Sequence, residues 1–193
     1  MKIGVIQASS QIEKNNMLYE CTKDYGEVIN FGCFENEENY SYVEIALEIC
    51  LLISSQAVDF VVTGCSSGQG MMIACNSLPN LICGYLPTPQ DAYLFGRIND
   101  GNVASLPLGL NYGWAGEINL KTTIQQLFEE PFGIGYPLKD AKRKQEDTKK
   151  IKGLNHLCKK DIIEFLDEID PTFINKVLSK KNVIDYILEQ GKD

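Results

Sequence analysis

Short apolar runs, separated by segments with helical patterns, constrain the fold of this chain most. They are Lys2–Gln7, Asp59–Thr63 and Leu81–Tyr85, with a weaker candidate at Glu27–Phe31 and a fifth at Asn102–Leu106. Runs of this length that stay nearly apolar throughout are typical of strands buried on both faces, as in a parallel sheet. We therefore expect five parallel strands.

The segments between these runs carry apolar residues at helical spacing. They are Tyr42–Ile53, Met71–Ser77, Gln90–Arg97 and Gly113–Glu129. Strands that alternate with helices build right-handed βαβ units. The pattern predicts an α/β fold with a doubly wound, five-stranded parallel sheet over residues 1–135.

The character of the sequence changes after Phe128. Residues 129–137 carry turn chemistry, and the charged run Lys142–Lys152 is interpreted as a solvated linker. Short helical patterns appear from Lys160 onward, and Asp170-Pro171 fits the start of a helix. We therefore interpret residues 136–193 as a linker and a helical C-terminal appendage, packed on the core or on a neighbouring subunit.

Charge and cysteine usage limit the partners and cofactors. A net charge of −8, from 26 acidic and 18 basic residues, argues against nucleic acid as a partner. No apolar run approaches the roughly 18 residues of a membrane helix, and the first strand is too short for a signal-peptide core. Seven irregularly spaced cysteines and one histidine predict neither a disulfide framework nor a zinc site. We expect a cytoplasmic protein without a bound metal.

The turn Cys65–Gly70 is the strongest candidate for a site. It follows a buried strand and precedes a helix, and open α/β sheets bind ligands at the carboxyl ends of their strands. The small residues Ser66, Ser67 and Gly68 allow close approach of the backbone, and amides at a helix start favour negative charge. The same amides favour the thiolate form of Cys65 at the rim of this turn.

Known phosphate and nucleotide motifs do not fit the turn. A Walker loop requires Gly-Lys-Ser/Thr, whereas Met71 follows Gly70, and Gly-x-Gly-x-x-Gly is absent. A cysteine-dependent phosphatase would have an arginine where Met71 stands. A cysteine beside an oxyanion cradle suits proton abstraction next to a carbonyl, through an enediolate held by N–H groups. The alternative is a tight turn with a buried, inert cysteine.

Two motifs, in order and at the expected separation, resemble the family of ribose-5-phosphate isomerase B and galactose-6-phosphate isomerase. The family reads Cys-Gly-Thr-Gly-x-Gly and His-Asn-Asp-x-Asn-Val, where this chain has Cys-Ser-Ser-Gly-Gln-Gly at 65–70 and Ile-Asn-Asp-Gly-Asn-Val at 98–103. The resemblance covers roughly residues 1–135. It implies a Rossmann-like fold, no cofactor, and homodimers or homotetramers with a site shared between protomers.

The resemblance also implies roles for individual residues. Cys65 would be the catalytic base, and Ser67 stands where the family's threonine assists ring opening. Gly68 and Gly70 would belong to the anion cradle, together with Ser66, and Gln69 is a candidate hydrogen-bond donor to a substrate oxygen. Asn99 would reach the substrate from the partner chain.

The chain departs from the family at its charged residues. The family's Ser-Asp-His after the first strand is replaced by Gln7-Ala8-Ser9, followed by Ser10 and Gln11. The family's histidine before Asn-Asp is Ile98, and its late Arg-His phosphate contact is replaced by Tyr136-Pro137. Losing these contacts argues against a sugar phosphate as substrate. Ser9, Ser10 and Gln11 would line the same crevice as substrate ligands, with helix capping as the alternative for the two serines.

The 4-deoxy-L-threo-5-hexosulose-uronate ketol-isomerase branch of this fold is more similar. The shared features are Ser10-Gln11, Thr63-Gly64-Cys65, Gly68-Gln69-Gly70, Ala74-Cys75-Asn76, residues 91–95, Gly113-Trp114, residues 117–120 and Leu127-Phe128-Glu129. That branch also extends beyond the usual isomerase. It acts on the unsaturated uronate released in glycosaminoglycan breakdown, whose carboxylate and open-chain dicarbonyl require neither a phosphate clamp nor a ring-opening acid.

The resemblance therefore implies a cofactor-free aldose–ketose isomerase that acts on this uronate. Two alternatives remain open: a sugar-phosphate isomerase of the ribose-5-phosphate or galactose-6-phosphate type, and a non-catalytic sugar-binding subunit of the same fold. Outside the turn, Arg97 is expected in a surface salt bridge or at the substrate carboxylate, and Trp114 in internal packing.

Overall fold

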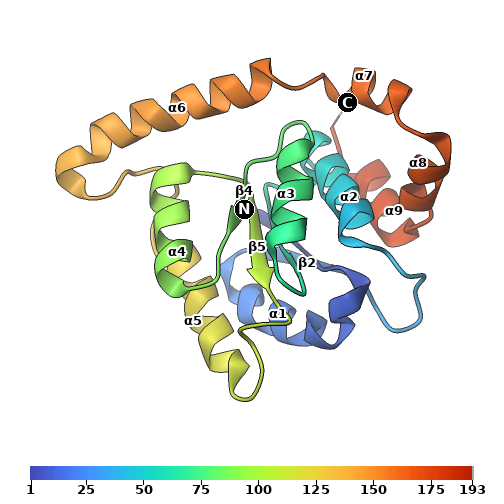
Figure 1. The fold of residues 1–193 in the computed structure, drawn as a ribbon, viewed down its shortest axis with the longest axis horizontal. Helices are drawn as coiled ribbons and strands as arrows, with labels where there is room; N and C mark the ends of the chain where they lie inside the picture. Colours follow the sequence, from blue (N-terminus) through green and yellow to red (C-terminus); the bar gives the residue numbers. More distant parts are fainter. Residues whose placement is uncertain (193) are drawn as a thin grey trace.

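The protein is described over residues 1–192 by a computed structural model (Figure 1). Within these residues, five strands form one parallel sheet in the order β2-β1-β3-β5-β4. The strands are β1 (Lys2–Ile6), β2 (Glu27–Gly32), β3 (Phe60–Cys65), β4 (Cys83–Tyr85) and β5 (Val103–Pro107). The predicted doubly wound α/β sheet is confirmed.

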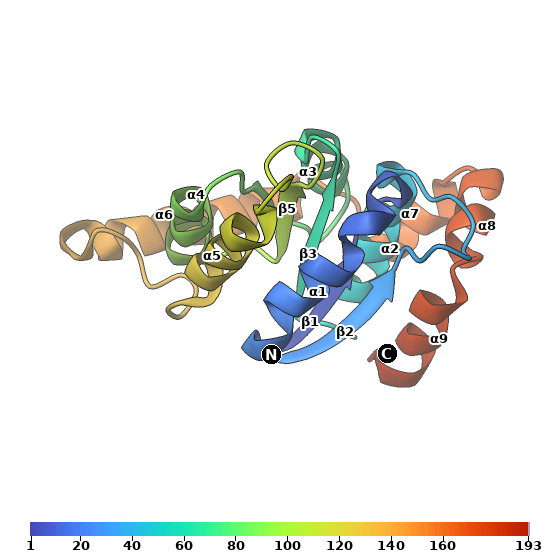
Figure 2. The same cartoon turned by 90° about the horizontal axis from the view of Figure 1, so that it is seen from below.

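Helices cover both faces of the sheet, as Figure 2 shows. On one face lie α2 (Tyr42–Ser54) and α3 (Gln69–Ser77), and on the other lie α1 (Asn15–Thr22), α4 (Pro89–Leu94) and α5 (Gly116–Phe128). Shorter helical turns are η1 (Ser9–Lys14), η2 (Lys23–Tyr25), η3 (Phe95–Asn99) and η4 (Leu138–Asp140). The sequence reasoning missed η1 and α1, which follow β1 directly.

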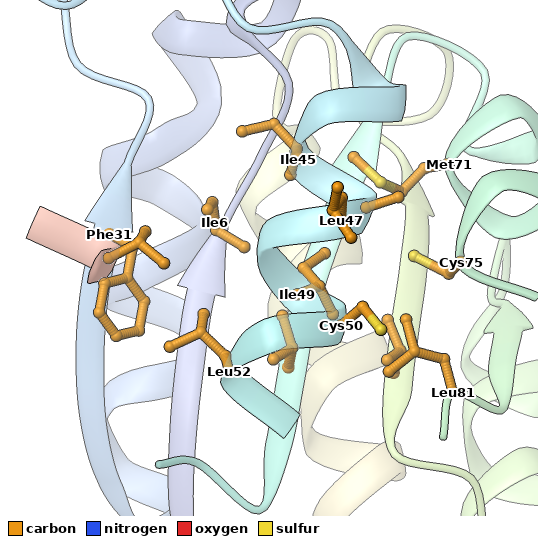
Figure 3. Close-up of a cluster of buried hydrophobic side chains, with 14 of the residues drawn as sticks. Ile6, Phe31, Ile45, Leu47, Ile49, Cys50, Leu52, Met71, Cys75 and Leu81 are labelled. Atoms are coloured by element: carbon orange, nitrogen blue, oxygen red, sulfur yellow. The ribbon is translucent and has the colours of Figure 1, made fainter. Parts of the chain in front are cut away.

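The apolar runs are buried on both sides because successive residues point to opposite faces. Ile3 and Val5 pack with α1 and α5, whereas Ile6 packs with α2 on the other face. Figure 3 shows the second of these cores, in which Leu47 of α2 lies beside Met71 of α3. Both faces are therefore closed, and the sheet is open to ligands only at its ends.

The C-terminal helices pack on the same chain. They are α6 (Ala141–Leu157), α7 (Ile162–Glu168), α8 (Pro171–Leu178) and α9 (Lys181–Gln190). Figures 1 and 2 show α8 and α9 beside α2, where Val177 and Val183 join the core that contains Ile6. The predicted helical appendage is therefore present. Among residues 1–192, no helix combines the length and apolar character that crossing a membrane requires.

The run Lys142–Lys152 is largely solvent-exposed, as expected, but it is not an irregular linker, because these residues belong to α6. Their lysines, arginine and glutamate have high helix propensity, which the charge pattern alone did not weigh. The helix is also attached to the domain: Thr148 Oγ1 donates to the carbonyl of Ile98 at 2.6 Å, and Lys152 pairs with Asp100.

Candidate active site

The candidate site lies where the sheet changes its direction of winding. β1 pairs with β2 on one side and with β3 on the other, and the helices that follow β1 and β3 leave toward opposite faces. A crevice at the carboxyl ends of the strands is expected at such a point. The turns after β1 and β3 meet there, because the amide of Ala8 donates to the carbonyl of Gly64 at 3.1 Å.

Cys65 is the last residue of β3, and 6 % of its surface is accessible. The backbone that follows β5 fixes the turn: Leu108 N donates to the carbonyl of Cys65 at 3.0 Å, and Gly109 N donates to that of Ser66 at 2.9 Å. The sequence analysis expected the thiol at the rim of the turn, whereas in the structure Cys65 is buried and belongs to a hydrophobic core. The contribution of residues 108 and 109 was missed, although Gly109, shortly after the predicted strand Asn102–Leu106, was an available signal.

Gly68 sets the start of α3. Its φ of +73° is left-handed, and an added Cβ would lie 2.9 Å from the backbone of Leu106 and Pro107. Its carbonyl accepts a hydrogen bond of 2.7 Å from Ser105 Oγ, which ties the turn to β5. Within the described residues no side chain caps α3, so the amides of its first turn, which includes Gln69 and Gly70, remain open to a ligand.

Three of the predicted polar ligands are brought together across the crevice. Gln11 Nε2 donates to Ser66 Oγ at 2.9 Å, and Ser10 Oγ lies 3.4 Å from the same oxygen. Ser10 and Ser66 are exposed, and Ser67 is half-buried beside them. The structure therefore brings hydroxyl and amide groups from two separate turns together at Ser66, the residue that follows Cys65.

Ser9 has a different environment from Ser10. Its Oγ accepts from the amide of Tyr40 at 2.8 Å, and its own amide donates to the Tyr40 carbonyl at 3.0 Å. Burial raises the pKa of the neighbouring Cys33 thiol, and a hydrogen bond with Ser9 acts in the opposite direction. In the part of the chain that the structure describes, no side chain caps η1, so the capping alternative for Ser9 and Ser10 is wrong.

Asn99 is not brought to Cys65 within one chain. Val103 of β5 pairs with Val61, and Pro107 pairs with Cys65, so the segment before Val103 lies at the opposite end of the sheet. The separation is about four residues of strand, or roughly 13 Å. Asn99 instead lines a cleft of about 350 Å³ along β4.

Two further expectations are wrong. Arg97 makes no surface salt bridge: it is fully buried, with its guanidinium 5.4 Å from the ring of Tyr93 and 5.3 Å from that of Phe132. Its Nη2 donates to the carbonyl of Leu127 at 2.9 Å, and burial lowers the pKa of the group. Trp114, expected to pack internally, is fully exposed.

Side chains suited to metal binding are not clustered. Among residues 1–192, no group of three or more His, Cys, Asp or Glu side chains is placed to hold a metal ion. All seven cysteines lie in this part of the chain, and each is a free thiol.

A family model described as Ribose/Galactose Isomerase matches residues 3–148. The chain belongs to the ribose/galactose isomerase family. This chain is similar to a solved structure, the crystal structure of a 4-deoxy-L-threo-5-hexosulose-uronate ketol-isomerase complexed with a tartrate. The two share 36% sequence identity, with a TM-score of 0.95. The similarity covers 100% of this chain and 94% of that chain.

Two other solved structures are also similar to this ribose/galactose isomerase family member. A ribose-5-phosphate isomerase from Vibrio parahaemolyticus has 32% identity and a TM-score of 0.93, over 100% of this chain and 93% of that one. A type B ribose 5-phosphate isomerase from Trypanosoma cruzi shares the fold, with 20% identity, a TM-score of 0.67, and coverage of 80% of this chain and 98% of that chain. No curated protein matches the sequence.

Proposed function

We propose that the protein is a cofactor-free ketol-isomerase that acts on 4-deoxy-L-threo-5-hexosulose-uronate. The observation that supports this proposal is that two turns meet at the carboxyl end of β3, where Cys65 ends the strand and the uncapped helix α3 begins shortly after it. A thiolate can remove a proton next to a carbonyl, and preorganised N–H groups can hold the negative oxygen that forms.

The chemistry is a proton transfer between adjacent carbons. Cys65 takes the proton from the hydroxyl-bearing carbon beside the aldehyde, which gives an enediolate. The same thiol then returns the proton to the former aldehyde carbon, while the hydroxyl proton moves between the two oxygens. The amides that follow Gly68 lie where the enediolate charge would be held, and Ser10, Gln11 and Ser67 supply hydrogen-bonding groups.

The arginines of the chain favour a carboxylate over a phosphate. The sequence contains two, Arg97 and Arg143. Arg97 is buried away from the turns, and Arg143 on α6 pairs with Asp147 at 3.2 Å. A phosphate dianion is commonly held by bidentate arginine, whereas a single carboxylate charge can be held by amides and hydroxyls.

Substrate preference tests this proposal. We expect kcat/KM for the uronate to exceed that for ribose 5-phosphate by at least about 100-fold, because neither arginine of the chain is placed to hold a phosphate at the turns. The measurement is steady-state turnover of both substrates, with galactose 6-phosphate as a third. Higher kcat/KM for either sugar phosphate would contradict the uronate assignment and favour a sugar-phosphate isomerase.

We also propose that the site is shared between two copies of the chain. Asn99 can approach Cys65 only from another protomer, because the two lie at opposite ends of one sheet. An apolar groove of about 310 Å³ runs beside the turn, between α2 and α3. Its exposed members Tyr42, Val43 and Ile73 offer a surface that a second copy would cover.

Mixing two inactive variants tests the shared site. Cys65→Ala and Asn99→Ala should each be inactive alone. A mixture that exchanges subunits should recover roughly a quarter of the wild-type activity, since half of the dimers are mixed and each has one intact site. Two different affinity tags on the variants, purified in succession, isolate the mixed dimers and establish that exchange occurs. Exchange without recovery would show that Asn99 and Cys65 do not act across an interface.

A further inference from the structure

A buried ammonium group lies at the corner between α8 and α9. Lys180 is 2 % exposed, and its Nζ lies 2.7 Å from Glu37 Oε2. The same Nζ lies 5.4 Å from the centre of the Tyr40 ring and 5.9 Å from that of Phe34. A charge at this depth requires partners, and all three partners here belong to the segment between β2 and α2.

Other residues of α8, α9 and the turn between them also contact this part of the chain. Ser179 Oγ lies 3.0 Å from the hydroxyl of Tyr40, and Asn182 Nδ2 donates to the carbonyl of Phe31 at 2.9 Å. Lys176 lies over the Tyr40 ring at 4.7 Å. Residues 31–40, which we call the latch segment, are therefore fixed by the appendage at both of their ends.

The latch segment holds the turn after β1. Tyr40 exchanges two hydrogen bonds with Ser9, one through the Ser9 hydroxyl and one through the Ser9 amide. The next two residues, Ser10 and Gln11, reach Ser66. An unbroken series of contacts therefore runs from Lys180 through Tyr40 and Ser9 to the residue that follows Cys65.

We propose that Lys180 and Tyr40 are positioning residues, through which the C-terminal appendage orients the substrate-binding turn Ser9–Gln11. This inference rests on the proposed function, because it assigns the turn to substrate binding. Among residues 1–192, neither residue hydrogen-bonds to Cys65 or to an amide of α3. Loosening the latch segment should therefore weaken substrate binding more than it slows the proton transfer.

Kinetics distinguish positioning from general stability. A variant that is merely less stable has fewer active molecules, which lowers the apparent kcat and leaves KM unchanged. A variant with a displaced turn keeps its thiol and amides but holds the substrate poorly. We expect Lys180→Met and Tyr40→Phe to raise KM for the uronate about tenfold, with kcat within about twofold of wild type.

Lys160→Met is the matched control. Lys160 also belongs to the appendage and also pairs with a carboxylate, that of Glu168, but both side chains are exposed and the pair joins Lys160 to α7 rather than to the latch segment. This substitution should leave KM and kcat unchanged.

Amide hydrogen exchange gives a readout that does not depend on the substrate. In Lys180→Met and Tyr40→Phe, exchange in the peptides that cover residues 8–12 and 31–40 should rise about tenfold, whereas β5 should stay protected. If the wild type turns over no tested sugar, the proposed function fails. Amide hydrogen exchange then still tests whether Lys180 and Tyr40 hold the turn Ser9–Gln11 in place. Unchanged exchange at residues 8–12 would overturn the inference, and so would a uniform rise across the sheet in both variants.

Discussion

Replacing Cys65 with alanine should abolish isomerisation while the sheet stays folded. In the proposed mechanism the Cys65 thiolate accepts the proton from carbon, and a general base contributes about 10²–10⁴-fold to rate. We expect kcat to fall by at least about 100-fold, with a loss of unfolding free energy of about 1 kcal/mol for the missing sulfur. Progress curves and urea unfolding measure the two effects.

Cys75→Ala is the matched control for this variant. Cys75 lies on α3, in the same core as Cys65, and is fully buried. Both substitutions remove one sulfur atom from that core, so both should destabilise the protein similarly, but Cys75→Ala should remain active. Full activity of Cys65→Ala would remove this residue from the mechanism.

Solvent isotope exchange separates an enzyme from a binding protein. In D₂O, wild type should introduce deuterium at the carbon that gains the proton, and Cys65→Ala should not. If the wild-type protein binds the uronate but incorporates no deuterium, the result would support the alternative that it is a non-catalytic sugar-binding subunit.

The sheet was predictable from sequence because its signal is local. Ile3, Val5 and Ile6 are all buried, so β1 is apolar throughout and its limits are visible in the sequence. The turn at 65–70 was equally visible, since a strand, small residues and a helix follow one another there. That Ser10 and Gln11 meet Ser66 then follows from the common edge of parallel strands.

The features that sequence reasoning missed depend on distant partners. Arg97 is buried because the rings of Tyr93 and Phe132 enclose it, and Phe132 lies in a segment that reads as a loop. Lys180 is buried against Glu37, 143 residues away. From sequence alone a charged residue is expected to be exposed. Only the tertiary structure shows the partners that allow such a residue to be buried.

The most unusual buried group is the carboxyl of Glu48. It lies on α2 with no exposed surface, and within the described residues neither of its oxygens has a hydrogen-bond partner. Burial raises its pKa to about 9, although Lys180 and Lys176 partly oppose this shift and Glu37 and Glu44 reinforce it. The folded protein therefore holds this carboxyl in its neutral form at pH 7.

The protonated carboxyl makes stability depend on pH. In the unfolded chain the group ionises near its ordinary pKa of 4.5, so unfolding releases a proton between pH 4.5 and about 9. Its contribution to stability is fully present below 4.5 and falls as pH rises, by up to about 1.4 kcal/mol per pH unit. Glu48→Gln keeps the shape and cannot ionise, so we expect it to remove this slope.

Urea unfolding of wild type and Glu48→Gln at pH 6, 7 and 8 measures the effect. The advantage of the variant should grow by about 1 kcal/mol with each pH unit, whatever the absolute offset from burying an amide. Glu189→Gln, at an exposed position on α9, should change the unfolding free energy by less than about 0.5 kcal/mol at every pH. If the unfolding free energies of wild type and Glu48→Gln depend on pH in the same way, Glu48 has the same pKa in the folded and unfolded states. Only a difference in bound protons between these two states makes the free energy depend on pH.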